Sequence, residues 1–211
     1  MRSMNNRTAN LFVIAAPSGA GKTSLVKALS TSIHDLLISV SHTTRDKRPA
    51  EMNGQDYFFV NHAVFDEMIA KQAFLEYATV FGNHYGTSRE WVTKQLAAGV
   101  DVILEIDWQG ARQVRELFPQ AILIFILPPS METLKERLQN RRQDDLETID
   151  ERMQAATDEI QHHREFDYLV VNDQFDVALQ DLQHIVLAAR LKTIVQVNKQ
   201  SELLANLLDS Q

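Results

Sequence analysis

Four short runs of apolar residues recur along the chain and predict buried β-strands. They occupy residues 11–15, 101–106, 121–127 and 168–171. Each run is nearly continuous rather than alternating, which is typical of strands covered by helices on both faces of a parallel sheet. We therefore expect an α/β fold built on a central parallel sheet.

Amphipathic segments follow these runs and predict the helices that cover the sheet. The segment 23–32 places Leu25, Val26 and Leu29 on one helical face. Further helices are expected at 110–117, 131–140 and 176–197. The apolar face of the last one comprises Ala178, Leu182, Ile185 and Ala189.

Two segments interrupt this alternation of strands and helices. Residues 39–87 are rich in Thr, Tyr, Phe, Gly and Asn, and they predict short antiparallel strands around a helix at 63–71. Residues 137–152 are densely charged. A sheet core with two inserted pieces, one beside each substrate, is typical of a group-transfer enzyme that closes over two ligands.

The turn after the first predicted strand carries a motif for binding phosphate. Residues 16–23 read APSGAGKT, and the phosphate-loop pattern is Gly, four free positions and Gly-Lys-Ser/Thr between a strand and a helix. Ala16 stands where the first Gly is expected. Lys22 would reach the β- and γ-phosphates, and the Thr23 hydroxyl would bind Mg²⁺. The alternative is an ordinary glycine-containing turn, but the Lys-Thr offset and the flanking elements favour nucleotide binding.

Composition and charge restrict the class of protein. The 211 residues suit one large domain, and the net charge of −7 argues against a broad surface for nucleic acid or anionic membrane. The chain has no Cys, which excludes disulfides and thiolate metal sites. Its longest apolar run is far shorter than a membrane span. We expect a soluble cytoplasmic protein that binds neither nucleic acid nor membrane.

A basic loop further along the chain predicts a second phosphate site. Arg45 and Arg48 lie three residues apart, and Tyr57 follows nine residues later. Guanidinium groups bind oxyanions in a bidentate way, and a phenol hydroxyl adds a further donor. Alone, this stretch would be a solvated basic loop. Beside a phosphate loop, a site for the terminal phosphate of a second substrate is favoured.

Several spaced motifs resemble those of guanylate kinases, the enzymes that phosphorylate GMP with ATP. The resemblance covers roughly residues 9–190 and is far more specific than the phosphate loop alone. The motifs are Thr43-Thr44-Arg45 … Arg48 … Glu51 … Gly54 … Tyr57-Phe58-Phe59, Glu76-Tyr77-Ala78, Gly82 to Thr87, Leu104 to Gly110, the arginines Arg137, Arg141 and Arg152, and Val171-Asn172-Asp173.

The resemblance implies a parallel-sheet phosphate-loop core with helices on both faces, an inserted GMP-binding subdomain and a helical lid. The implied domain spans 9–190, with the core at 9–38, 88–130 and 160–198, the GMP-binding insert at 39–87 and the lid at 131–159. Residues 199–211 would form a C-terminal tail. This tail is either a short helix packed on the same chain or a contact in a homo-oligomer.

For GMP, the resemblance implies two groups of residues. The phosphate would be held by Arg45, Arg48, Tyr57 and Tyr85, and guanine would be read by Ser41, Glu76 and Thr87, with Glu105 nearby. A carboxylate suits guanine, because the adjacent N1–H and amino group form a pair of donors that adenine lacks. The alternative for Glu76 is an exposed charge at the end of a strand.

For ATP, the resemblance implies the phosphate loop and two residues late in the chain. The loop residues are Ala16, Pro17, Ser18, Gly19, Ala20, Gly21, Lys22, Thr23 and Ser24. Asn172 and Asp173 would lie at the adenine, and the alternative there is a simple turn. Mg²⁺ would be held by Thr23 and by Asp107, directly or through water. Glu105 is the other acid at this strand end, and either acid could instead cap the following helix.

The implied catalysis needs positive charge rather than a general base. The attacking phosphate oxygen of GMP is already largely ionised at neutral pH, because its second pKa is about 6. Lys22 and Arg45, with the lid residues Arg137, Arg141 and Arg152, would neutralise the charge of the transferring phosphoryl group. Arg142 has no counterpart in the resemblance.

Two other functions compete with this one. A guanylate-kinase-like module that binds peptides without catalysis would not need intact Lys22 and Thr23. A kinase for another small phosphate, such as a ribose bisphosphate, would have no use for the guanine-reading residues. The residues therefore favour phosphoryl transfer from ATP to GMP.

Overall fold

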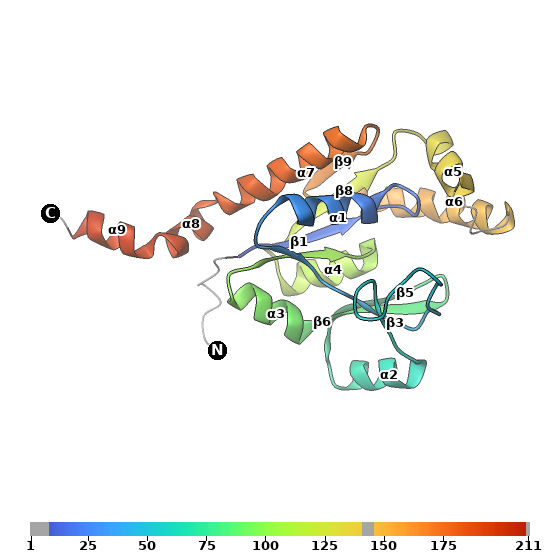
Figure 1. Ribbon diagram of the computed structural model, residues 1–211, viewed down its shortest axis with the longest axis horizontal. Coiled ribbons are helices and arrows are strands. Elements are labelled where there is room, and N and C mark those ends of the chain that lie inside the picture. The colour runs from blue at the N-terminus through green and yellow to red at the C-terminus, as the bar shows by residue number, and fades with distance from the viewer. Residues whose placement is uncertain (1–8, 141–145, 210–211) are drawn as a thin grey trace.

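A five-stranded parallel sheet forms the centre of the structure, a computed structural model that describes residues 9–140 and 146–209. The strands are β1 (Leu11–Ala15), β2 (Leu36–Ile38), β7 (Asp101–Glu105), β8 (Ile122–Leu127) and β9 (Tyr168–Val171). Their order is β2-β7-β1-β8-β9 (Figure 1). The four predicted strands are confirmed, and the short edge strand β2 is additional to them.

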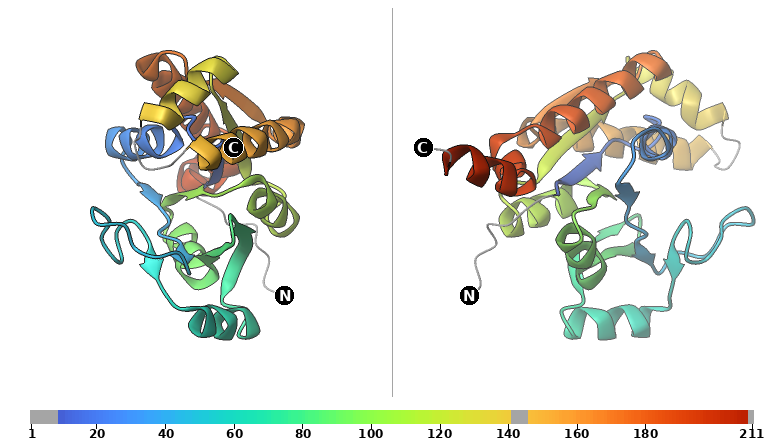
Figure 2. Two further views of the ribbon diagram at one scale, coloured as in Figure 1. Left: turned by 90° about the vertical axis from the view of Figure 1, so that its right-hand side faces the viewer. Right: turned by 60° about the vertical axis from the view of Figure 1, so that its left-hand side comes forward.

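Helices cover both faces of this sheet. They are α1 (Lys22–Ser32) and α7 (Phe175–Arg190) on one face, and α3 (Arg89–Ala97) and α4 (Trp108–Leu117) on the other (Figures 1 and 2). Side chains of β1 alternate between the two layers: Phe12 and Ile14 pack with α1 and α7, whereas Val13 packs with α3 and α4. Both faces of β1 are therefore buried, and the predicted α/β fold is confirmed.

A second, smaller sheet lies beside the first, with α2 (His62–Ala70) packed beneath it (Figure 1). Its strands are β3 (His42–Thr43), β4 (Phe58–Phe59), β5 (Phe74–Val80) and β6 (Asn83–Ser88), in the order β4-β3-β6-β5. The prediction of antiparallel strands is correct for β5–β6 and β3–β6 but wrong for β3–β4, which are parallel. The long connection between β3 and β4 returns the chain to the start of β3, as a parallel pair requires.

Two helices, α5 (Met131–Asn140) and α6 (Leu146–Gln161), form a separate pair at one end of the central sheet (Figure 1). They share a small core of Leu134, Leu138, Ile149 and Ala156. Helix α5 has the predicted bounds, whereas α6 falls in a segment that the sequence marked mainly by its charge. A short 3₁₀ helix, η1 (His162–Glu165), connects α6 to β9.

The predicted helix 176–197 is wrong as a single element, because the structure divides it into α7 and α8 (Thr193–Lys199). Helix α7 ends after its buried face of Ala178, Leu182, Val186 and Ala189 is complete. The backbone of Lys192 is extended, so the chain changes direction before α8 begins.

The tail forms a further helix, α9 (Ser201–Leu208), which points away from the sheet on the side opposite to α5 and α6 (Figure 1). All residues of α9 are exposed, including Leu203, Leu204, Leu207 and Leu208. The helix contacts α8 of the same chain, and both alternatives for the tail stay predictions. Within 9–140 and 146–209, no helix combines the length and the apolar character needed to cross a membrane.

Candidate functional site

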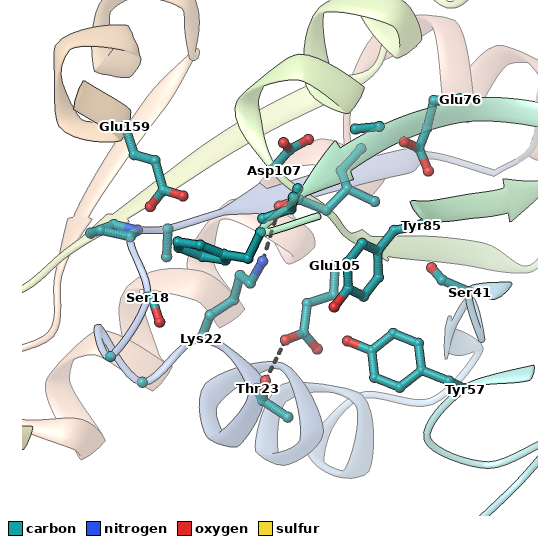
Figure 3. A pocket seen from close by; sticks show the side chains of 18 residues that line it. Ser18, Lys22, Thr23, Ser41, Tyr57, Glu76, Tyr85, Glu105, Asp107 and Glu159 are labelled. Atoms are coloured by element: carbon teal, nitrogen blue, oxygen red, sulfur yellow. Dashed lines mark hydrogen bonds between the residues drawn. The ribbon is translucent and has the colours of Figure 1, made fainter. Parts of the chain in front are cut away.

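A cavity of about 250 Å³ lies where the carboxyl ends of β1 and β7 meet the second sheet and α6 (Figure 3). Its polar lining includes Ser18, Lys22, Thr23, Ser41, Tyr57, Glu76, Tyr85, Glu105, Asp107 and Glu159. Ligands of parallel α/β sheets bind at this edge of the sheet. The structure thus brings residues from the predicted ATP and GMP groups into one cavity.

A second cavity, of about 550 Å³, adjoins the first. The two cavities share Thr23, Ser41, Tyr57, Tyr85 and Glu105. The lining of the second also includes Ser24, Arg45 and Arg48, the last two being the arginines of the predicted second phosphate site. All the predicted GMP residues except Thr87 therefore line one or both of these adjoining cavities.

The turn between β1 and α1 requires glycine at two positions. Gly19 has φ 95° and Gly21 has φ 89°, in the left-handed region that favours glycine. A Cβ on Gly21 would lie 2.3 Å from Nδ2 of Asn172, and one on Gly19 would lie 3.0 Å from Leu134. The turn is therefore packed from two sides, by the end of β9 and by α5.

The two polar side chains that begin α1 are both held by the end of β7. Lys22 Nζ donates to the backbone oxygen of Ile106 over 2.9 Å. The Thr23 hydroxyl hydrogen-bonds the carboxylate of Glu105 (Figure 3). These contacts place the amine and the hydroxyl on the cavity side of the helix N-terminus, where backbone N–H groups favour anions.

Asn172 has a structural contact that its sequence position did not predict. It is 5% exposed, and its Nδ2 donates to the backbone oxygen of Ala20 over 2.7 Å. Its own backbone oxygen accepts from Nη2 of Arg137 over 2.9 Å. Asn172 thus supports the phosphate loop from behind, while its neighbour Asp173 is exposed and lines neither cavity.

The predicted lid arginines lie outside the two cavities as far as the structure describes them. Arg137 donates a hydrogen bond to the backbone oxygen of Asn172. The guanidinium of Arg152 lies 5.9 Å from the centre of the Phe81 ring. Arg141, and Arg142 with it, fall outside the described residues.

The predicted base-reading residues form a buried group at the opposite side of the main cavity. Thr87 Oγ1 donates to Glu76 Oε1 over 2.5 Å, and the Ser41 and Thr87 hydroxyls are 3.5 Å apart. Glu76 is 3% exposed, so the alternative of an exposed charge at a strand end is wrong. Burial raises the pKa of Glu76 to about 7; the Thr87 hydrogen bond opposes this rise, and the nearby Asp107 carboxylate adds to it.

Gly110 in α4 makes room for the Glu76 carboxylate. A Cβ at this position would lie 2.4 Å from Glu76 Oε2. Gly110 closes one motif of the resemblance and begins the predicted helix 110–117, but its sequence position did not predict this contact. The pair joins α4 to β5 across the floor of the cavity.

The predicted phosphate arginines are organised by Glu51. Its carboxylate accepts from Arg45 Nη2 over 2.6 Å and from the Arg48 backbone N–H over 2.8 Å. Burial opposes its ionisation, but these contacts with Arg45 and Arg48 together lower the pKa of Glu51. The Arg45 guanidinium also lies 5.5 Å from the centre of the Tyr57 ring, whose pKa is raised to about 12, chiefly by burial.

The two acids at the end of β7 have different contacts. Asp107 caps α4: its Oδ1 accepts from the Gly110 backbone N–H over 2.9 Å and its Oδ2 from Gln109 over 3.0 Å. Glu105 instead faces the Thr23 hydroxyl. Within the described ranges no three His, Asp or Glu side chains cluster as a metal site.

Glu159 on α6 is a cavity residue that the sequence did not reveal. It lines the main cavity together with Ser18 and Lys22 of the phosphate loop, and its buried Oε2 has no hydrogen-bond partner among the described residues. Burial raises the pKa of Glu159 to about 7, whereas Lys22 lowers it. A glutamate on an amphipathic helix has no local pattern that distinguishes it from a solvated surface charge.

Known proteins resemble this chain over almost its whole length. A family model described as Guanylate kinase matches residues 8–189. A guanylate kinase of Coxiella burnetii (strain RSA 493 / Nine Mile phase I) is 59% identical over 203 residues, 96% of this chain and 98% of that protein. One of Legionella pneumophila (strain Paris) is 53% identical over 208 residues, 99% and 100% of the two chains. The crystal structure of guanylate kinase from Anaplasma phagocytophilum has a TM-score of 0.74 and 32% identity, covering 89% of each chain.

The contact between Gly110 and Glu76 predicts energetic coupling. Gly110→Ala should lower the free energy of unfolding by about 1–3 kcal/mol, because the methyl group overlaps the carboxylate. In a Glu76→Ala background the same change should be neutral or stabilising, since Ala favours helix over Gly. Urea unfolding of the four proteins measures the coupling. An equal cost of Gly110→Ala in both backgrounds would contradict the prediction.

The raised pKa of Glu76 predicts a pH-dependent stability. The folded state binds this proton up to about pH 7, whereas the unfolded glutamate releases it near its ordinary pKa of 4.5. The stabilisation by protonation is therefore complete below pH 4.5 and is lost as pH rises through about 7. Relative to the wild type, Glu76→Gln should gain about 2–3 kcal/mol between pH 5 and pH 8, measured by urea unfolding. A difference that is constant with pH would show that the carboxyl ionises normally.

Proposed function

The chain belongs to the guanylate kinase family, and we propose that its two adjoining cavities are where the γ-phosphoryl group of ATP is transferred to GMP, giving ADP and GDP. The assignment of GMP to one side of the main cavity and of ATP to the other rests on one observation. The buried carboxyl group of Glu76 and the hydroxyl of Ser41 line the same cavity as the phosphate loop, and the buried hydroxyl of Thr87 hydrogen-bonds Glu76. Such a site can bind a base that has two adjacent hydrogen-bond donors, and at the same time it can bind the nucleotide that donates the phosphoryl group.

On the GMP side, Glu76 accepts from N1–H and the amino group of guanine, and Thr87 and Ser41 complete the contacts to the base. These two donors stabilise the ionised carboxyl, which burial otherwise disfavours. Arg45 and Arg48, oriented by Glu51, hold the phosphate with the hydroxyls of Tyr57 and Tyr85. The insert 39–87 is in this proposal the GMP-binding subdomain.

On the ATP side, residues 16–24 hold the phosphates, and Lys22 moves from the Ile106 carbonyl to the β- and γ-phosphates. The hydrogen bond from Asn172 to Ala20 supports a role for Asn172 in shaping the loop, with Asp173 nearer the adenine. The lid is in this proposal residues 131–159. Its arginines, Arg137, Arg141 and Arg152, approach the transferring group when both substrates are bound.

The end of β7 suits a magnesium ion bound together with ATP. Thr23 and Glu105 supply a hydroxyl and a carboxylate that already face one another, whereas both oxygens of Asp107 accept hydrogen bonds within α4. We therefore place the metal at Thr23 and Glu105, with Asp107 reached through water. When bound, the metal neutralises phosphate charge. The attacking phosphate oxygen is already ionised, so the residues position the two phosphates rather than remove a proton.

Two further features of the chain bear on its cellular location and its oligomeric state. The composition without Cys supports a cytoplasmic location, where both nucleotides are substrates. The exposed leucines of α9 support a homo-oligomer contact, and sedimentation of a chain ending at Lys199 tests it.

Loss of the loop amine should remove catalysis more than acceptor binding. Lys22→Ala should lower kcat by at least about 10²–10³-fold, because the developing phosphoryl charge loses its closest cation. GMP affinity, measured by calorimetry without ATP, should change by less than about twofold, since Lys22 lies on the other side of the cavity. Lys94→Ala, on the exposed face of α3, is the control. Retained turnover in Lys22→Ala would reject the proposed role.

Glu76 should determine the choice of base. With ATP and Mg²⁺, the wild type should phosphorylate GMP with a kcat/KM about 10³–10⁴-fold above that for AMP. Glu76→Ala should lose most of this ratio mainly through GMP, while Glu67→Ala, an exposed change on α2, should keep it. A coupled assay with a panel of nucleoside monophosphates measures the ratios. Equal rates with AMP and GMP in the wild type would reject the proposed function itself.

A further inference from the structure

The hairpin between β5 and β6 carries a bulky aromatic residue where its backbone favours Asn or Gly. Val80 pairs with Asn83, so the turn has two central residues, Phe81 and Gly82, with φ 47° and 73°. Positive φ at both central residues is the pattern of type I′ turns, in which Asn-Gly is preferred. A phenylalanine in this left-handed conformation is strained. Local backbone preference therefore does not explain a Phe at the tip of this hairpin.

Burial in a hydrophobic core does not explain this residue either. Phe81 is 53% exposed, and it lines the main cavity. The centre of its ring lies 5.9 Å from the guanidinium carbon of Arg152 on α6. This distance is within the range over which the face of an aromatic ring attracts a cation. Phe81 thus links the hairpin of the second sheet to the helix that carries one of the predicted lid arginines.

We propose that Phe81 is a positioning residue, whose ring holds the guanidinium of Arg152 beside the main cavity for phosphoryl transfer. The proposal rests on the proposed function, in which this cavity binds ATP and GMP. An arginine side chain in water samples many rotamers, and contact with the ring restricts them before the substrates bind. Less entropy is then lost when the guanidinium reaches the transferring group. The strain at the turn is the cost of placing an aromatic ring at this point.

The test uses Phe81→Asn, because this change suits the turn while it removes the ring. The urea midpoint of the variant should equal or exceed that of the wild type. Its kcat with saturating ATP, Mg²⁺ and GMP should fall about 3–10-fold, and its KM for GMP should change by less than about twofold. Phe81→Leu should lose the same factor in kcat, since leucine has no aromatic face. Phe81→Tyr, which keeps the ring, should stay within about twofold of the wild type.

Gln72→Asn is the matched control for the change at the turn. Gln72 also has a positive φ, of 52°, and is exposed, but it lines neither cavity. Substitution by Asn therefore suits its backbone in the same way without removing a contact to Arg152. The kcat of this variant should stay within about twofold of the wild type.

A double-mutant cycle shows whether Phe81 acts through the arginine. In an Arg152→Ala background, Phe81→Asn should lower kcat further by less than about twofold. An equal loss in both backgrounds would overturn the proposal, because Phe81 would then act without Arg152. An unchanged kcat in Phe81→Asn, or the same loss in Phe81→Tyr, would overturn it as well. A wild type that does not phosphorylate GMP would instead reject the proposed function.

Discussion

The turn between β1 and α1 is the constraint on which the site depends. Two glycines in left-handed conformation leave no space for side chains, and Asn172 and Leu134 fill the volume around them. Because β1 is the central strand, its end lies between the ends of β7 and the β8–β9 pair. Asn172, which follows β9, can therefore support the turn from one side, while Glu105 and Asp107, at the end of β7, lie on the other.

Electrostatics gives this arrangement its selectivity. Four carboxyl groups, from Glu76, Glu105, Asp107 and Glu159, line the main cavity, and Lys22 is the only cationic side chain among its described lining residues. Burial of these carboxyl groups disfavours their ionisation, as the pKa of about 7 for both Glu76 and Glu159 indicates. The cavity thus suits ligands that bring donors or a cation with them. In the proposed function, guanine would supply the donors and a magnesium nucleotide would supply the cation.

The sequence predicts features that local patterns determine, and it misses those that depend on distant contacts. The four apolar strands and the phosphate loop were predicted because burial on both faces and a fixed glycine spacing leave local signals. Strand β2 has three residues, too few for a pattern. The contact of Glu76 with Gly110, and that of Asn172 with Ala20, join segments far apart in the chain. Glu159 likewise resembles a surface charge until the fold brings it to the loop.

Internal carboxyl groups lie in both of the proposed phosphate-binding regions, but their surroundings differ. Glu51 binds one nitrogen of Arg45, and a guanidinium has five N–H donors, so several remain for a phosphate. That contact orients Arg45 in advance and lowers the entropy lost on binding. Glu159 instead lines the main cavity beside Ser18 and Lys22 of the phosphate loop, where burial raises the pKa of its carboxyl to about 7. A carboxylate paired with a guanidinium therefore preorganises the proposed GMP side, whereas a carboxyl buried beside the loop favours its protonated form.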